Sequence, residues 1–163
     1  MVGMNQSEAR SSSCSLPLII NGGRRMQKMI DIVVKAEDID HLGHMNYMKY
    51  LFYLEKGVIN WYEMVGIGRK VLDEKGLGTV LIQFDVSYKQ EARLGDQLKI
   101  ITSLTHVGNK SFIVHQEIYN QEEQLLTRCK KVFVMFNTRT RKGIPVVQEI
   151  AQFALQLNKE NTL

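Results

Sequence analysis

The sequence changes its hydrophobic period once, and this change constrains the fold more than any other feature. From residue 47 to residue 65, apolar side chains recur at steps of three and four, which is typical of one face of an amphipathic helix. After Gly78 the period falls to two, and residues 79–89 alternate as a half-buried strand. Three more long strands are predicted, at residues 98–107, 111–119 and 124–137.

Shorter elements complete this pattern. The β-branched run at residues 30–36 predicts a first strand, residues 69–75 a short second helix, and residues 147–157 a terminal helix. One helix laid against a curled antiparallel sheet buries both the helical stripe and the alternating faces, so the predicted class is α+β. Such a sheet has exposed edges that invite pairing with a second copy, so we expect a homo-oligomer, in the simplest case a homodimer.

The length of 163 residues fits one domain, which we expect at residues 29–158. Residues 1–28 mix Ser, Asn, Gly and Arg without periodicity and are expected to be a flexible tail, with a short C-terminal tail at residues 159–163. The net charge is +4, but the first 28 residues carry +3 of it and leave about +1 for the body. This near-neutral body argues against a nucleic-acid partner.

Several protein classes are excluded by the sequence. No apolar run approaches the roughly 18 residues that span a bilayer, and the run at residues 16–20 is too short for a secretory signal, so we expect a cytoplasmic protein with no membrane partner. Cys14 and Cys129 lie far apart, which favours neither a disulfide framework nor a zinc site. There is no Gly-x-Ser-x-Gly elbow and no P-loop, and Gly66-Ile67-Gly68 lacks the third glycine of a dinucleotide fingerprint.

Proton-handling side chains gather where the first strand gives way to the long helix. Asp38, Asp40, His41, His44 and Asn46 all fall within nine residues. Clusters of this kind at element ends favour chemistry, although Asp and Asn also suit a turn that only caps a helix. A metal site is conceivable from carboxylate and imidazole ligands, but the spacing matches no established cage, and we expect none.

Without a metal, the arrangement still offers catalytic groups. The first turn of a helix has backbone N–H groups without intrahelical partners, and the helix dipole favours negative charge there. A carbonyl oxygen at this point would be polarised, and an oxyanion forming on it would be stabilised. Asp40 could activate water or attack the carbonyl carbon itself. The sequence therefore predicts acyl transfer to water.

Residues 37–47 read Glu-Asp-Ile-Asp-His-Leu-Gly-His-Met-Asn-Tyr and are followed by Tyr50-Leu51 and by residues 53–55, Tyr-Leu-Glu. This stretch resembles the opening of the hotdog-fold acyl-CoA thioesterases of the 4-hydroxybenzoyl-CoA thioesterase type. Residues 84–88 with 93–96, and residues 108–112, resemble the second and fourth strands of that family. The resemblance covers about residues 30–147, and the same fold also carries hydratases and acyl-carrier-protein thioesterases.

This resemblance implies a sheet wrapped around one long central helix, in a dimer with active sites at the subunit interface, often paired into a tetramer. The catalytic aspartate of the family falls on Asp40, as general base or nucleophile, and the carbonyl-polarising N–H falls at about Tyr47. One branch of the family has a histidine at the position of Tyr47, whereas here the imidazole comes earlier, at His44. Asn46 stands where a related branch uses Asn to orient substrate or water.

Other roles are open for the same residues. Asp40 could be a helix cap, and His44 and Asn46 could serve only to hold the turn. Asp38 is interpreted as structural. Glu55 lies two turns into the helix, where another hotdog branch has its catalytic carboxylate, but its position favours solvent or interface pairing.

The resemblance also implies an acyl-CoA substrate, of which coenzyme A is a part, and no cofactor. Lys110 and Ser111 are the candidates to bind the phosphates of coenzyme A, since cationic side chains and loop N–H groups are what phosphates require. A wider set of basic residues could share this role: Arg128, Lys130, Lys131, Arg139 and Arg141. The alternatives are an acyl-carrier-protein thioesterase, a non-catalytic acyl-CoA or lipid-binding module and, less strongly, a hydratase.

Overall fold

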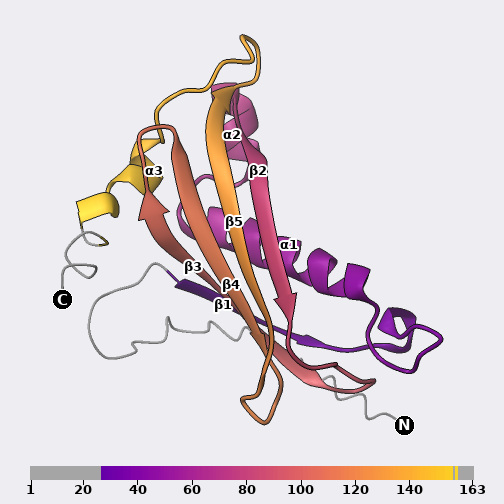
Figure 1. Cartoon of the computed structure of the whole chain (residues 1–163). Coiled ribbons are helices and arrows are strands. Elements are labelled where there is room, and N and C mark those ends of the chain that lie inside the picture. The colour runs from indigo at the N-terminus through magenta and orange to yellow at the C-terminus, as the bar shows by residue number, and fades with distance from the viewer. Residues whose placement is uncertain (1–26, 156, 158–163) are drawn as a thin grey trace, which may run out of the picture.

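The computed structural model describes residues 27–155 and residue 157, so most of the two expected tails lies outside the described residues. The described chain forms one five-stranded antiparallel sheet in the order β1-β3-β4-β5-β2 (Figure 1). The strands are β1 (Gln27–Val33), β2 (Leu77–Tyr88), β3 (Gln97–Val107), β4 (Ser111–Tyr119) and β5 (Leu125–Asn137).

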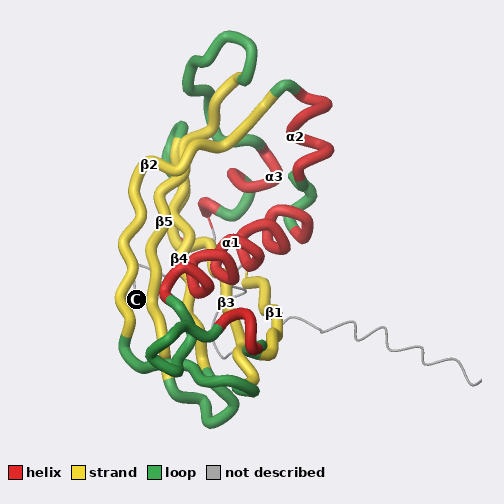
Figure 2. The backbone as a smooth tube through the Cα atoms, turned by 90° about the vertical axis from the view of Figure 1, so that its right-hand side faces the viewer, coloured by secondary structure: helices red, strands yellow, loops and turns green. Residues whose placement is uncertain are grey.

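The long helix α1 (Tyr47–Met64) crosses the concave face of this sheet (Figure 2). The apolar stripe faces the sheet, with Tyr50, Leu54, Val58 and Trp61 buried. The α1 backbone lies closest to β1 and β3, and Figure 2 shows the sheet curling around it. The α+β architecture with one central helix, predicted from the change of period, is therefore confirmed.

A polar layer crosses the core beneath the middle of α1. The side-chain amide of Gln116 donates to the Leu54 carbonyl at 2.7 Å and to Thr102 Oγ1 at 2.9 Å. Gly57 permits this close approach, because a Cβ there would lie only 2.7 Å from Gln116 Nε2. Apolar clusters lie on either side of the layer. The height of α1 above the sheet, and with it the position of the helix start, is therefore fixed from below.

The edge strand β2 departs from the predicted alternation. Phe84 and Val86 are partly buried, as expected, but Val80 and Ile82 are 40% and 60% exposed. A register shift between Leu81 and Gln83 leaves Ile82 as a bulge opposite β5, and a bulge reverses the side on which later residues point. The half-buried pattern predicted for the first part of this strand is therefore wrong.

The other elements agree with the sequence to different degrees. The helix α2 (Arg69–Lys75) has the predicted bounds, with Gly76 in the left-handed region at φ +65° as its C-cap. The first strand ends at Val33, three residues before its predicted end, and a 3₁₀ turn, η1 (Ala36–Asp38), follows. The predicted terminal helix is interrupted, since α3 (Gln148–Ala151) is followed by a turn at residues 152–153 before residues 154, 155 and 157 are helical again. No helix among the described residues has the length and apolar character needed to cross a membrane.

Candidate active site

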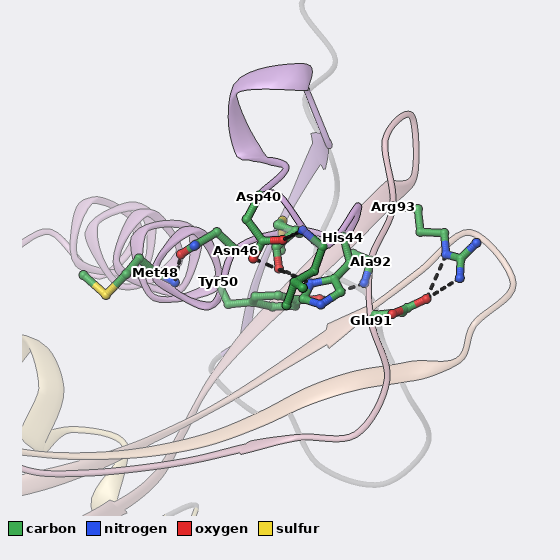
Figure 3. A network of polar contacts seen from close by, with 10 residues as sticks. Asp40, His44, Asn46, Met48, Tyr50, Glu91, Ala92 and Arg93 are labelled. Atoms are coloured by element: carbon green, nitrogen blue, oxygen red, sulfur yellow. Dashed lines mark hydrogen bonds and ion pairs between the residues drawn. The ribbon is translucent and has the colours of Figure 1, made fainter.

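The loop between β1 and α1 is a tight turn held by main-chain hydrogen bonds. An isolated antiparallel bridge joins Ile39 to Met45, and the Asp40 N–H donates to the His44 carbonyl at 3.0 Å. At the tip, the Gly43 N–H donates to the Asp40 carbonyl at 3.0 Å, with Gly43 in the left-handed region at φ +83°. This turn brings Asp40 and His44 together, with His44 Nδ1 at 3.9 Å from Asp40 Oδ2 (Figure 3).

The Asp40 carboxylate has one fixed oxygen and one available oxygen. Oδ1 accepts the Leu42 N–H at 2.9 Å, which sets the orientation of the side chain. Oδ2 faces His44. The Asp40 side chain is 16% exposed to solvent, which is enough for a small reactant to reach this oxygen. The helix cap is Asn46 and not Asp40, so the capping alternative for Asp40 is wrong. His44 Nδ1 also lies 3.3 Å from the Met45 carbonyl.

The start of α1 leaves one backbone donor free. Asn46 Oδ1 accepts the Met48 N–H at 2.9 Å, as expected of an N-cap, and the Lys49 N–H donates to the Asn46 carbonyl. The Asn46 N–H is taken by the Asp38 carbonyl at 2.8 Å. Within the described residues no acceptor lies on the Tyr47 N–H. The amide that the sequence singled out is thus available at the positive end of the helix dipole.

Asp38 anchors the base of this loop from inside the protein, in agreement with its interpretation as structural. Its carboxylate accepts the Lys35 N–H at 2.9 Å and the Tyr53 hydroxyl at 2.7 Å, and it lies 3.1 Å from Lys49 Nζ. Burial opposes ionisation of Asp38, but the hydrogen bonds from Lys35, Tyr53 and Lys49 outweigh it and hold the pKa of this carboxyl below its ordinary value. A charged Asp38 therefore ties the loop to the first two turns of α1.

A second anchor comes from the connection between β2 and β3, which the sequence did not place at the site. The Met45 N–H donates to the Ala92 carbonyl at 2.8 Å, and the Ala92 N–H donates to the Tyr50 hydroxyl oxygen at 2.8 Å. Figure 3 shows Tyr50 reaching from α1 to Ala92 beneath Asp40 and His44. The loop that carries Asp40 is therefore clamped to both α1 and the sheet.

Lys110 and Ser111 lie at the opposite end of the sheet from Asp40. They belong to the hairpin between β3 and β4, whereas the chain reaches Asp40 from the end where Val33 pairs with Gln97. The 11 residues of β3, from Gln97 to Val107, span about 33 Å. A single chain does not bring the predicted phosphate-binding residues to the predicted catalytic residue.

A sequence model of the thioesterase-like superfamily matches residues 34–154. Among the curated proteins none matches the sequence.

Solved structures similar to this chain include a 1,4-dihydroxy-2-naphthoyl-CoA thioesterase from Synechocystis, with a TM-score of 0.71 and 21% identity over 79% of this chain and 95% of that one. A hypothetical protein from Staphylococcus aureus in complex with CoA has a TM-score of 0.75 and 16% identity over 89% of each chain. A mutant 4-hydroxybenzoyl-CoA thioesterase in complex with 4-hydroxybenzoyl-CoA has a TM-score of 0.71 and 21% identity, over 79% of this chain and 99% of that one. These similarities confirm the expected hotdog fold.

Proposed function

The chain belongs to the thioesterase-like superfamily and is a thioester hydrolase, and we propose that it hydrolyses acyl-CoA thioesters with Asp40 as the catalytic carboxylate. One observation carries the proposal: the loop that presents Asp40 ends at a helix start whose Tyr47 N–H has no acceptor among the described residues. The resemblance of the fold to CoA thioesterases supports the choice of carrier. The cytoplasmic location expected from the sequence stays part of this proposal.

The proposed reaction follows from these two groups. The thioester carbonyl oxygen accepts the Tyr47 N–H, and the negative charge that develops on it is stabilised by the helix dipole. Asp40 Oδ2 takes a proton from water as the water oxygen attacks the carbonyl carbon, or it attacks that carbon itself. In the general-base variant the carbon–sulfur bond then breaks, the proton held by Asp40 passes to the leaving sulfur, and the free acid and the thiol of coenzyme A are released. In the covalent variant, water hydrolyses the resulting anhydride and restores the carboxylate.

His44 and Asn46 have supporting parts in this proposal. His44 Nδ1 lies 3.9 Å from Asp40 Oδ2, beyond direct hydrogen-bond distance, so we propose that its imidazole flanks the available oxygen and orients a water molecule beside it. Asn46 Oδ1 already accepts the Met48 N–H. The Nδ2 amino group of the same side chain is therefore the part left to orient substrate or water. The structural and the catalytic interpretations of Asn46 are thus compatible, because they use different atoms.

We propose a homodimer formed through β2, either alone or as half of a tetramer. Beyond β2 the described sheet has no further strand, and Val80, Leu81 and Ile82 expose 40–60% of their surface there. An edge of this kind is a template for pairing with a second copy. Two β2 strands related by a two-fold axis run antiparallel, so the start of one lies beside the end of the other.

This dimer also accounts for the separation of Lys110 from Asp40. The end of β2 adjoins the start of α1, where the Tyr88 hydroxyl donates to the Tyr47 carbonyl at 3.5 Å. The start of β2 pairs with the end of β5, near the hairpin that carries Lys110 and Ser111. Antiparallel pairing of two copies therefore brings the hairpin of one copy toward Asp40 of the other, where its cationic side chain can meet the phosphates of coenzyme A.

Replacing Asp40 tests the assignment. Asp40→Asn should lower thiol release from acyl-CoA by about a hundredfold or more, since the amide cannot accept the proton. Glu37→Gln is the matched control, because Glu37 is an exposed carboxylate three residues away, and it should leave turnover unchanged. Equal turnover by Asp40→Asn and the unsubstituted enzyme would exclude Asp40.

The same assay separates the alternatives. Faster hydrolysis of one acyl group on an acyl carrier protein than on coenzyme A would favour a carrier-protein thioesterase. Tight acyl-CoA binding by calorimetry without thiol release would favour a binding module. Hydration of an enoyl-CoA in place of hydrolysis would favour a hydratase.

A further inference from the structure

An apolar seam leads from the proposed reaction centre along the side of α1; it is open at Tyr47, which is 60% exposed, and partly buried further along. It is formed by Tyr47 and Leu51 on the helix and by Phe84, Val86 and Tyr88 on β2 and is called the α1–β2 seam below. At its beginning the Tyr88 hydroxyl contacts the Tyr47 carbonyl, next to the free Tyr47 N–H. An acyl group whose thioester carbonyl binds that N–H therefore has apolar side chains beside it.

A charged pair interrupts this seam two turns further along α1. Lys131 on β5 lies 3.1 Å from Glu55 Oε2, and its Nζ lies 5.5 Å from the centre of the Phe84 ring. The Lys131 side chain is 4% exposed, whereas that of Glu55 is 55% exposed. The buried ammonium thus depends on a carboxylate that is itself still hydrated.

The positions of Glu55 on the helix and of Phe84 on the strand give the same distance from the beginning of the seam to this ion pair. Glu55 lies eight residues after Tyr47, which is about 12 Å along a helix. Phe84 lies four residues before Tyr88 on β2, about 13 Å along a strand, and pairs with Lys131 in the sheet. The apolar part of the seam is therefore about 12 Å long.

An alkyl chain that continues beyond this depth must cover the Glu55 carboxylate. Covering it removes water from a charge whose one hydrogen-bond partner in the described part of the chain is Lys131, and burying a charge in apolar surroundings is strongly unfavourable. Further along, the Tyr62 hydroxyl donates to Thr79 Oγ1 at 3.1 Å and closes the gap between α1 and β2. Chain length beyond the ion pair thus brings a desolvation cost that shorter chains avoid.

We propose that the Glu55–Lys131 ion pair forms the end of the acyl-binding site and limits the enzyme to acyl groups of about eight to ten carbons, the number that fits about 12 Å when each C–C bond of about 1.5 Å advances an extended chain by about 1.25 Å. This inference rests on the proposed function and adds a substrate class to it. Glu55 and Lys131 are specificity-determining residues here and take no part in bond making or breaking.

The test is a series of saturated acyl-CoA substrates from four to sixteen carbons, with kcat/KM measured below the micelle-forming concentration of the longest ones. The unsubstituted enzyme should have a kcat/KM at least tenfold higher for chains of up to about eight carbons than for sixteen carbons. Burying one unsatisfied polar group has an effect of this size. The double variant Glu55→Leu with Lys131→Met removes both charges at once, so no unpaired charge is left buried. It should gain tenfold or more on the longest chains relative to the short ones.

The matched control is an ion pair outside the seam, between the end of α2 and the start of α3. Lys75 Nζ lies 2.6 Å from Glu149 Oε1 there. Lys75→Met with Glu149→Leu makes the same chemical change and should leave the chain-length profile unaltered. Circular dichroism and sedimentation of both double variants check that they fold and assemble like the parent.

Two results would overturn the inference, and both differ from failure of the proposed function. The unsubstituted enzyme could hydrolyse sixteen-carbon and eight-carbon substrates equally well, or the seam variant could keep the parent profile. If no acyl-CoA is hydrolysed at all, the proposed function fails, and calorimetric binding of the same series to the Asp40→Asn protein still measures chain length. A binding profile without a break at about eight to ten carbons would then reject the role of the ion pair.

Discussion

Removing the Asp38 carboxylate should destabilise the protein by about 3–4 kcal/mol, because two of its donors are left without an acceptor. A hydrogen bond to a charged group contributes about 1.5–3 kcal/mol, and Asp38 accepts such bonds from the Lys35 N–H and the Tyr53 hydroxyl. Lys49 is one-third exposed and can return to water, so its loss adds little. The substitution also removes the desolvation cost of a buried charge, which offsets part of the loss. The expected destabilisation is therefore at the lower end of the sum of the two hydrogen bonds.

For a chain of this size, Asp38→Ala should lower the melting temperature by about 10 °C. Tyr53→Phe removes one donor while the carboxylate keeps Lys35 and Lys49, so it should cost only about 1.5 kcal/mol. The double variant should cost less than the sum of the two single changes, since both remove the same hydrogen bond. Urea denaturation of the four proteins measures all three values.

The pH dependence provides an independent check on this charge. Because the folded-state pKa of Asp38 is below its ordinary value of 3.8, its stabilising contribution is complete above that pH and is lost as the pH falls through the folded pKa. The difference in unfolding free energy between the parent and Asp38→Asn should therefore be constant at neutral pH and shrink below about pH 4. A loss of less than 1 kcal/mol in Asp38→Ala, or a difference that persists undiminished in acid, would refute this account of the loop anchor.

Three further outcomes are expected. Asn46→Ala removes the acceptor of the Met48 N–H and should cost about 1 kcal/mol in urea denaturation, while Asn46→Asp, which retains a cap, should not. Gly57→Ala places a Cβ 2.7 Å from a side chain of the sheet and should lower the melting temperature by several degrees, or prevent folding, whereas a harmless substitution would show that the helix height is adjustable. Burial raises the pKa of the Cys129 thiol to about 12, so in a Cys14→Ser background a thiol reagent at pH 8 should label the protein only after unfolding, and rapid labelling of the native form would contradict the burial.

Features set by a strong local pattern were predictable from the sequence. The helix α1 has the predicted start at Tyr47, because its apolar stripe continues for nearly five turns. The strand β4 has the predicted bounds, since a turn limits it at each end. Asp40 and His44 lie close together because a tight turn through Gly43 joins them. This proximity was predictable from the local sequence motif alone.

Features that depend on distant partners were not predictable. The first strand is displaced by three residues because its pairing with β3 sets its register, and nothing local records that pairing. The bulge at Ile82 does not interrupt the alternation of apolar and polar residues in the sequence. It does change the face of the sheet to which the side chains on one side of it point. Tyr53 and Lys131 were noted in the sequence for other reasons, but their contacts with Asp38 and Glu55, like that of Ala92 with Tyr50, join separate elements and no local pattern predicts them.

The order of strands has a consequence for synthesis on the ribosome. β2 is complete at Tyr88, but β5, its neighbour in the finished sheet, begins only at Leu125 and ends at Asn137. At about 5–20 residues per second, the ribosome needs roughly two to ten seconds to make the intervening chain. During that interval β2 lacks the strand that flanks it in the finished sheet, so its backbone and apolar residues stay open to other strands until β5 emerges.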